Sequence, residues 1–395
     1  MKNSKQLSQV TSGIGLLFLS ALFFVLILIG AELTYRRYVE NKPREFDLGH
    51  LVTQDIHVAK PYVMFTSRPG YQQYGEPGFI PGQINALGYL GALPTKLKPK
   101  SEYRIFLLGG SAAFFGTPPF SISLEKLFQT NGHPEVKVFN FSVIAGVSRQ
   151  ELIRILTDIA GYEPDLIISY TGYNDMYDTG WDPRINYPHR YILSEANPVT
   201  ARSAADYKLL PTLALSSQYL RDHYPNFIFD QLTKGIYPNY MPQRQTIRPL
   251  IAKAFIQNLR LSNNLSEQLG SKYMAFFQPT VFFKKNLTES ETNLFKPQDL
   301  KIAEEALTAV QNEVRPFLKE FNFIDASNLF SDQPRTAFVD YVHYVDEPWL
   351  KEAIAKYVYE NILKTVDLNK RSMAKIQNLA PEEIFTFNPP AEVQK

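Results

Sequence analysis

Short apolar runs alternate with longer amphipathic segments from residue 103 onward, and this alternation restricts the possible fold more than any other feature. Apolar runs of strand length occur at 105–108, 136–141, 165–170, 273–278 and 321–325. Segments with helical spacing lie between and after them, at 121–129, 149–160, 254–269, 301–320 and 349–363. Buried strands that alternate with helices are typical of a parallel sheet covered on both faces. We therefore predict an α/β fold, a three-layer α/β/α sandwich around a five-stranded parallel, flavodoxin-like sheet.

The composition excludes several classes of function. The net charge of +2 on 395 residues is too small to argue for a nucleic-acid partner, and no basic run is dense enough to follow a phosphate backbone. The chain has no cysteine, so disulfides and thiolate metal sites are excluded. No grouping of His, Asp and Glu has metal-ligand spacing, and GGSAAFFG at 109–116 lacks the lysine of a phosphate-binding loop. We expect no metal and no cofactor.

A long apolar segment near the N-terminus predicts a membrane anchor. Residues 13–31 read GIGLLFLSALFFVLILIGA, in which Ser20 is the only polar side chain. This is about the length that crosses a hydrocarbon core of roughly 30 Å as a helix. No small-residue cleavage site follows it. We predict a short tail at 1–12 and an uncleaved transmembrane helix at 13–33.

Two arguments about the orientation of this segment in the membrane disagree. More basic residues follow the span than precede it, which alone would place the C-terminal side in the cytoplasm. Long domains, however, cross a membrane largely regardless of nearby charge. We expect a single-pass protein whose large domain is extracytoplasmic, in the periplasm or at the cell surface.

The remaining segments divide the chain further. Mixed, then Pro- and Gly-rich sequence predicts a linker and extended lead-in at 34–100, followed by the folded domain at 101–370. A stretch at about 176–250 is rich in Tyr, Pro and Asn. It is too long for an ordinary connection, so we predict a lid or insertion. Residues 371–395 form a polar tail.

Polar residues follow the predicted strands where they end. Ser111 comes directly after Gly109 and Gly110, and Asn140 is followed by Ala145 and Gly146. The third strand runs into GYND at 172–175, and DYVH at 340–343 precedes the last helix. Since the carboxyl ends of parallel strands meet at one edge of a sheet, we expect these groups to lie together.

These residue types suit acyl transfer from a serine. A serine hydroxyl is a weak nucleophile and needs an adjacent base, for which histidine has a suitable pKa. We predict Ser111 as the nucleophile, His343 as the base and Asp340 as the carboxylate that orients it. Of the six histidines, only His343 has both features: an aspartate three residues before it and a position ahead of the closing helix.

The oxyanion that forms during such a reaction needs hydrogen-bond donors. Candidate donors are the backbone amides near Ser111 and Ala145, with Gly146 as an alternative, and the side-chain amide of Asn174. Structural roles are also open: Ser111 could cap a helix, Asn174 and Asp175 could form an Asx turn, and His343 could be a surface residue.

Taken in order, these blocks resemble the SGNH (GDSL-like) hydrolase family over roughly 103–365. GGS at 109–111 is similar to the first block, where many members have GDS. GYND carries the family's Gly and Asn as Gly172 and Asn174, and DYVH carries its DxxH pair as Asp340 and His343. The lead-in INALGYLG at 84–91 and FQPT at 277–280 also resemble a membrane-anchored bacterial branch, often associated with cell-surface polymers.

One position departs from the family pattern. In the family's second block, here residues 140–146, the resemblance implies a glycine five residues after Asn140, where this chain has Ala145 and then Gly146. Alanine supplies the same backbone N–H, but it would be strained if the position requires positive φ. A shift of register onto Gly146 is the alternative.

The insertion supplies candidate substrate contacts. Aromatic rings can stack on sugars, which makes Tyr177, Trp181, Tyr187 and Tyr191 candidates for substrate binding. His189 in the insertion and Tyr173 just before it are further candidates. The four aromatic rings within the insertion could instead be its core.

Two interpretations of function follow, with an envelope scaffold as a third. The first is a membrane-anchored serine esterase or O-acyltransferase that acts on an acyl ester, such as an acetyl group on an envelope or exported polysaccharide. The second is a catalytically silent module of the same fold that binds a glycan or a membrane partner, which the altered second block and the long insertion favour. A serine-reactive probe discriminates between them.

Overall fold

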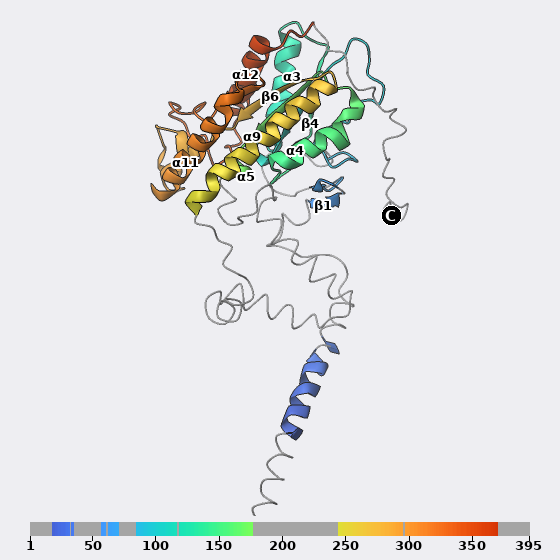
Figure 1. Ribbon diagram of the computed structural model, residues 1–395, viewed down its shortest axis with the longest axis vertical. Coiled ribbons are helices and arrows are strands. Elements are labelled where there is room, and N and C mark those ends of the chain that lie inside the picture. The colour runs from blue at the N-terminus through green and yellow to red at the C-terminus, as the bar shows by residue number, and fades with distance from the viewer. Residues whose placement is uncertain are drawn as a thin grey trace, which may run out of the picture. The chain divides into compact units, whose positions relative to one another are not determined.

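The computed structural model describes residues 18–31, 33–34, 57–60, 62–70, 84–116, 118–176, 244–294 and 297–369 (Figure 1). The chain divides into two compact units. One comprises Met1–His50 and Ser194–Tyr240, and the other comprises Leu51–Leu193 and Met241–Lys395. The candidate site lies in the second unit.

The second unit is built on a five-stranded parallel sheet with the order β4-β3-β5-β6-β7. Its strands are β3 (Tyr103–Gly109), β4 (Val136–Asn140), β5 (Leu166–Thr171), β6 (Lys272–Phe277) and β7 (Asn322–Asp325). All four neighbouring pairs are parallel. This is the flavodoxin-like strand order, so the prediction of a five-stranded parallel sheet is confirmed.

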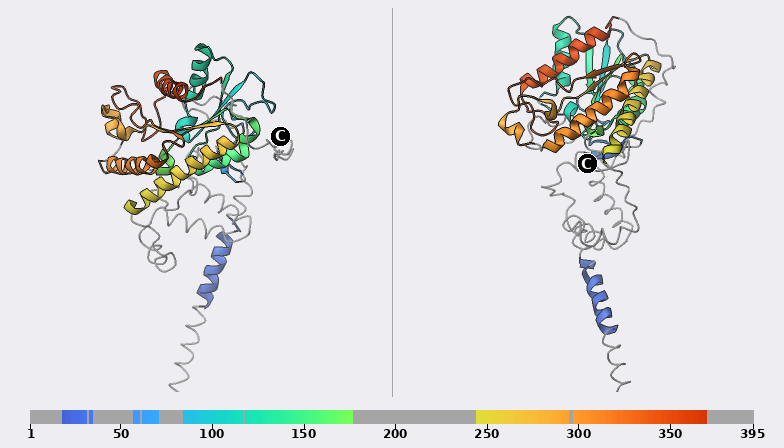
Figure 2. Two further views of the ribbon diagram at one scale, coloured as in Figure 1. Left: turned by 45° about the horizontal axis from the view of Figure 1, so that its top comes forward. Right: turned by 60° about the vertical axis from the view of Figure 1, so that its left-hand side comes forward.

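Helices cover both faces of this sheet (Figure 2). On one face lie α3 (Phe120–Thr130) and α12 (Pro348–Thr365), and on the other lie α4 (Ser148–Arg154), α9 (Arg244–Gln268) and most of α11 (Pro297–Val314). Successive side chains of a strand point to opposite faces. Ile105 and Leu107 of β3 accordingly join the first core, and Phe106 and Leu108 join the second.

Prolines explain where two helices differ from the predicted ranges. Helix α9 begins at Arg244 rather than near 254 and contains Pro249, a residue that normally ends a helix. Helix α11 stops at Val314 and passes into the 3-10 turn η5 (Arg315–Phe317), because Pro316 lacks the N–H that would continue it.

Short elements complete the unit. Helix α4 continues as a π-helical turn, η1 (Ile155–Ile159), and a 3-10 turn, η2 (Ala160–Tyr162). Four further short helices follow strands or lie in loops: α2 (Ser111–Phe114), α5 (Tyr173–Met176), η4 (Val281–Phe283) and α10 (Glu289–Thr292).

The described part of the lead-in is packed into the domain. Strands β1 (His57–Lys60) and β2 (Met64–Ser67) form an antiparallel pair that the sequence pattern did not indicate. Tyr89 is fully buried and stacks on Phe141 at a ring distance of 4.2 Å. The boundary predicted at residue 101 therefore falls inside the folded unit, since aromatic side chains of the lead-in complete its core.

Residues 18–31 of the first unit are helical and expose apolar side chains. Within the residues that the structure describes, no helix combines the length and the apolar character that a membrane crossing requires. Residues 13–17 and 32 of the predicted span lie outside that description, so the anchor stays a prediction.

Candidate active site

Ser111 follows the end of β3, an inner strand of the sheet. All seven residues of β3 are buried, and Gly110 is the N-cap of the short helix α2, which Ser111 begins. No side chain caps this helix. The Ser111 hydroxyl instead lies 2.6 Å from Nε2 of His343. The structure therefore does not use Ser111 as a helix cap, the alternative that the sequence left open.

Asp340 and His343 form the rest of a hydrogen-bonded chain. His343 Nδ1 lies 2.6 Å from Asp340 Oδ2. The other carboxylate oxygen, Oδ1, accepts hydrogen bonds from the backbone N–H groups of Val342, at 2.9 Å, and His343, at 2.7 Å. The carboxylate is thus fixed by its own turn and can orient the imidazole.

The charge state of Asp340 fits this role. Burial on its own would raise the pKa of Asp340. Hydrogen bonds from His343 and Val342 and the charge of His343 outweigh burial, so the pKa lies below its ordinary value. In a neutral imidazole, a hydrogen bond from Nδ1–H to the ionised Asp340 leaves Nε2 as the nitrogen that can accept the Ser111 proton.

The Asn174 side chain meets the loop after β4 and the glycine before Ser111. Its Nδ2 donates a hydrogen bond to the backbone oxygen of Gly146 at 2.8 Å. A Cβ on Gly110 would lie 2.5 Å from that same Nδ2, so the absence of a side chain at 110 lets the amide approach. The structure brings these predicted segments together. Since an amide carries two hydrogens, one N–H beyond the bond to Gly146 can serve an oxyanion.

Ala145 occupies a position that favours glycine. It has φ of 58°, and the Gly146 N–H closes the turn by donating to Val143 O at 2.9 Å. The third residue of such a β-turn needs positive φ, which strains an alanine. The Gly146 N–H is thus engaged inside the turn. Among the described residues, no hydrogen-bond acceptor is found for the backbone N–H of Ala145 or Ser111. These two N–H groups are therefore stronger candidates than that of Gly146 for donors to an oxyanion.

Packing holds this strained turn in place. Ala145 and Ile144 share a small buried cluster with Phe114, which lies in the same short helix as Ser111, and with Ile84 and Leu90 of the lead-in. Asn140, which ends β4, donates to Ala113 O at 2.9 Å and accepts from the Ser142 N–H at 3.0 Å. The side chain of Asn140 therefore links the second block to helix α2 rather than lying at the reacting groups.

The hydrogen-bonded pair of Ser148 and Asp175 is buried and was not predicted from the sequence. Both oxygens of Asp175 accept from Ser148, one from its hydroxyl at 2.6 Å and one from its N–H at 3.0 Å. Asn258 donates to the Ser148 hydroxyl at 2.9 Å. Burial raises the pKa of Asp175 to about 7 despite the hydrogen bonds from Ser148. The pair ties the segment of Asn174 to helix α4, which follows Ala145.

Of the predicted substrate contacts, the structure describes only Tyr173. Tyr173 is partly buried and packs against the core on the α3 and α12 face. Tyr177, Trp181 and His189 lie outside the described residues. The ring of Phe115 contacts His343 edge-on at 5.8 Å and was not predicted. In the described part of the chain, no three His, Asp or Glu side chains are placed to hold a metal ion.

Comparisons with known proteins give only weak likenesses. No family model and no curated protein matches the chain. An acetyl xylan esterase of known structure is 10% identical with a TM-score of 0.38, over 66% of this chain and 99% of that one. A putative GDSL-like lipase from Parabacteroides merdae is 13% identical with a TM-score of 0.38, over 67% and 98%. An acetylxylan esterase from Geobacillus stearothermophilus is 12% identical with a TM-score of 0.38, over 68% and 98%. Likenesses of this strength carry no argument about activity.

Proposed function

We propose that the chain is a serine esterase of SGNH type. The observation that carries the proposal is the chain of two 2.6 Å contacts, from Ser111 Oγ to His343 Nε2 and from His343 Nδ1 to Asp340 Oδ2. A hydroxyl so close to an unprotonated imidazole nitrogen can lose its proton to it as it attacks a carbonyl carbon. The Asp340 carboxylate then stabilises the imidazolium that forms.

The reaction proceeds in two halves. Ser111 Oγ bonds to the acyl carbon, and the carbonyl oxygen gains negative charge near Asn174 Nδ2 and the N–H groups of Ser111 and Ala145. His343 gives its proton to the leaving alcohol oxygen as the carbon–oxygen bond breaks, which leaves an acyl-serine. Water, or a second alcohol in a transferase, then bonds to the acyl carbon and loses a proton to His343. The bond from the acyl carbon to Ser111 Oγ breaks as His343 returns the proton to Oγ, which releases a carboxylic acid or, in a transferase, a new ester.

Turnover of an activated acetyl ester tests this proposal. The parent should hydrolyse the ester, and Ser111→Ala should remove the activity while the fold stays intact. Ser101→Ala, a change at an exposed position in the turn before β3, is the matched control and should leave turnover unaltered. Equal turnover by the parent and Ser111→Ala would reject Ser111 as the nucleophile.

For the natural substrate, we propose an acyl ester of a carbohydrate, with acetyl as the acyl group and an envelope polysaccharide as the carrier. The apolar segment at 13–33 would hold the domain at a membrane on its extracytoplasmic side. Reporter fusions after residues 10 and 60 test this placement. Activity of an export-dependent reporter after residue 60 supports it, and a cytoplasmic signal there rejects it.

A silent binding module is the second candidate. It is favoured by the left-handed Ala145, because strain in the second block could disturb a donor of the oxyanion hole. Such a module would hydrolyse no ester, and the parent and the Ser111→Ala variant would bind an acetylated glycan equally well. Loss of turnover in Ser111→Ala, with turnover present in the parent, excludes it.

A further inference from the structure

The hairpin that carries the base has no strand of the main sheet to hold it. Asp340 and His343 lie between β7 and α12, at the tip of a short hairpin over 337–345. Val339 N–H donates to His343 O, Val345 N–H donates to Ala337 O, and Phe338 pairs with Tyr344. The side chains at the tip are 51% exposed for Asp340 and 32% exposed for His343. Between them, Val342 is buried and the Val281 N–H donates to Tyr341 O at 3.1 Å, but neither contact involves Asp340 or His343 itself.

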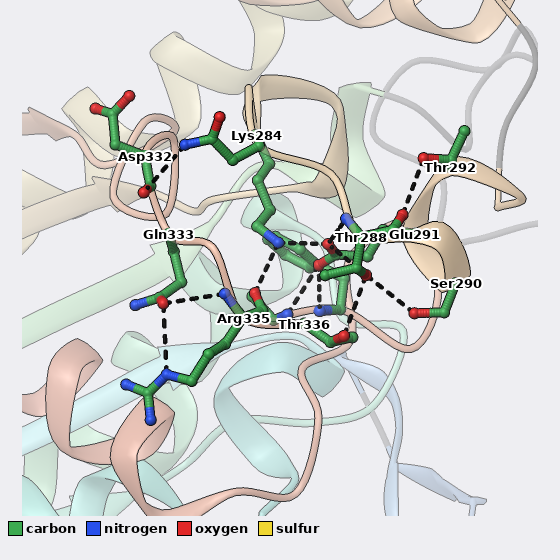
Figure 3. A network of polar contacts seen from close by, with 12 residues as sticks. Lys284, Thr288, Ser290, Glu291, Thr292, Asp332, Gln333, Arg335 and Thr336 are labelled. Carbon is green, nitrogen blue, oxygen red and sulfur yellow. Dashed lines mark hydrogen bonds and ion pairs between the residues drawn. The ribbon is translucent and has the colours of Figure 1, made fainter.

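A buried ion pair contacts the hairpin where its first strand begins (Figure 3). Lys284 and Glu291 contact each other through Nζ and Oε2, and both side chains are fully buried. Glu291 Oε1 accepts from the backbone N–H of Ala337 at 2.8 Å and of Phe338 at 3.2 Å. Phe338 precedes Asp340 by two residues, so these bonds fix the backbone where the hairpin leaves the core.

Further hydrogen bonds of the same pair hold the segment that enters the hairpin. Lys284 Nζ donates to Arg335 O at 2.7 Å, which holds the chain just before the hairpin. Thr288 donates to Glu291 Oε2 from its N–H and from its hydroxyl, both at 3.0 Å, so the carboxylate itself is fixed. Burial would raise the pKa of Glu291, but the hydrogen bonds from Lys284, Thr288 and Ala337 outweigh it and place the pKa below its ordinary value.

A buried ion pair is a costly way to gain stability, because apolar residues of similar size often stabilise as well or better. It does, however, supply directional contacts that apolar residues lack. Catalytic side chains must be held within about 0.5 Å of their working geometry. The Lys284–Glu291 pair supplies such directional hydrogen bonds at the residues where the hairpin starts.

We propose that Lys284 and Glu291 are positioning residues for the base, and that their contacts with 335–338 keep His343 Nε2 within reach of Ser111. This inference rests on the proposed esterase function. Neither side chain touches the reacting groups. Their loss should therefore lower kcat and leave KM unchanged, since the geometry of proton transfer changes and substrate contacts do not.

Paired variants test the proposal in the full chain. Lys284→Met with Glu291→Met removes both charges and all acceptors for Ala337 and Phe338. Lys284→Met with Glu291→Gln removes the charges but keeps an amide oxygen for those N–H groups. We expect the Met/Met protein to lose about 10²-fold in kcat, the effect of a misplacement of about 1 Å, and the Met/Gln protein to recover part of it. The low-field proton resonance of the Asp340–His343 hydrogen bond should shift in Met/Met and return towards the parent position in Met/Gln.

A second ion pair provides the control. Lys98 Nζ lies 2.6 Å from Asp165 Oδ2, and the two side chains are 10% and 8% exposed. Asp165 directly precedes β5, so the pair lies at the end of the sheet opposite Ser111. Lys98→Met with Asp165→Asn should leave kcat and the low-field resonance as in the parent. Should Met/Met fail to fold, Glu291→Asp keeps the charge and withdraws the acceptor by one methylene, and it should lower kcat in a folded protein.

The outcomes separate the two proposals. A folded Met/Met or Glu291→Asp protein with the parent's kcat and resonance overturns the positioning role. Equal losses in the Lys98–Asp165 variant also overturn it, because they would show a general effect of destabilisation. A parent that hydrolyses no ester overturns the esterase function, and the low-field resonance alone then decides whether the pair positions His343.

Discussion

The two sides of the candidate site are held by different parts of the fold. Ser111 and Asn174 directly follow β3 and β5, neighbouring strands of the sheet whose residues are all buried. Asp340 and His343 lie on a hairpin outside the main sheet, tied down by the Lys284–Glu291 pair. Backbone hydrogen bonds of the sheet hold the segment of Ser111, whereas the segment of Asp340 and His343 depends on the hairpin's own backbone bonds and on the side chains of Lys284 and Glu291. Changes in distant side chains should therefore affect the base more than the nucleophile.

Loss of the base should have the largest effect. His343→Ala removes the group that accepts the Ser111 proton, so kcat for an acetyl ester should fall by about 10²–10⁴-fold. Asp340→Asn combined with His343→Ala should cost little more than His343→Ala alone, because the two act as one unit with Ser111. Steady-state kinetics on the three proteins measures this, and near-parental turnover by His343→Ala would contradict the assignment.

Loss of a donor on the nucleophile side should have the next largest effect. Asn174→Leu keeps the size of the side chain but removes its N–H donors, so kcat should fall by about 10²–10³-fold while KM changes little. The low-field resonance of the Asp340–His343 pair should not move, since the base side is held independently. A shift of that resonance in Asn174→Leu would break the comparison between the two sides.

The buried carboxyl on the nucleophile side predicts a pH dependence of stability. The pKa of Asp175 is raised to about 7 in the folded protein, above its ordinary value. The folded state therefore holds a proton that the unfolded state has lost, and stability falls as pH rises towards 7. Relative to Asp175→Asn, the parent's free energy of unfolding should drop by about 1.4 kcal/mol between pH 5 and 6, and by less per unit near pH 7, where Asp175 also ionises in the folded state. Urea unfolding across this range measures the difference, and parallel curves would refute it.

Relief of the Ala145 strain should have the smallest effect. A left-handed non-glycine residue costs roughly 1–2 kcal/mol, and glycine loses part of that gain through the entropy of the unfolded chain. Ala145→Gly should therefore raise the free energy of unfolding by up to about 1 kcal/mol and preserve kcat.

Gly146→Val provides the contrast to Ala145→Gly. A Cβ at 146 would lie 2.9 Å from Val143 O and 3.0 Å from Arg154 Nη2, so this change should damage the protein. A harmless Gly146→Val together with a harmful Ala145→Gly would reverse our description of this turn.

The sheet and the four main candidate residues of the site could be predicted because each has a local pattern. Buried strands are apolar runs, and Ser111, Asn174 and the Asp340–His343 pair stand at their ends or before a helix. The supports could not be predicted, since their partners are far apart and share no pattern: Ser148 and Asp175 are 27 residues apart, and Glu291 and Ala337 are 46 apart. The lead-in was missed because its short strands are separated by Pro61 and a left-handed Tyr62.

The central claim is that His343 activates Ser111 for covalent attack. Treatment of the full chain with a fluorophosphonate, followed by peptide mass mapping, tests it directly. We predict that the adduct lies on Ser111, that it forms in Asn174→Leu more slowly, and that it is absent from Ser111→Ala and strongly reduced in His343→Ala. An adduct on another residue, or none on the folded parent protein, would contradict the account.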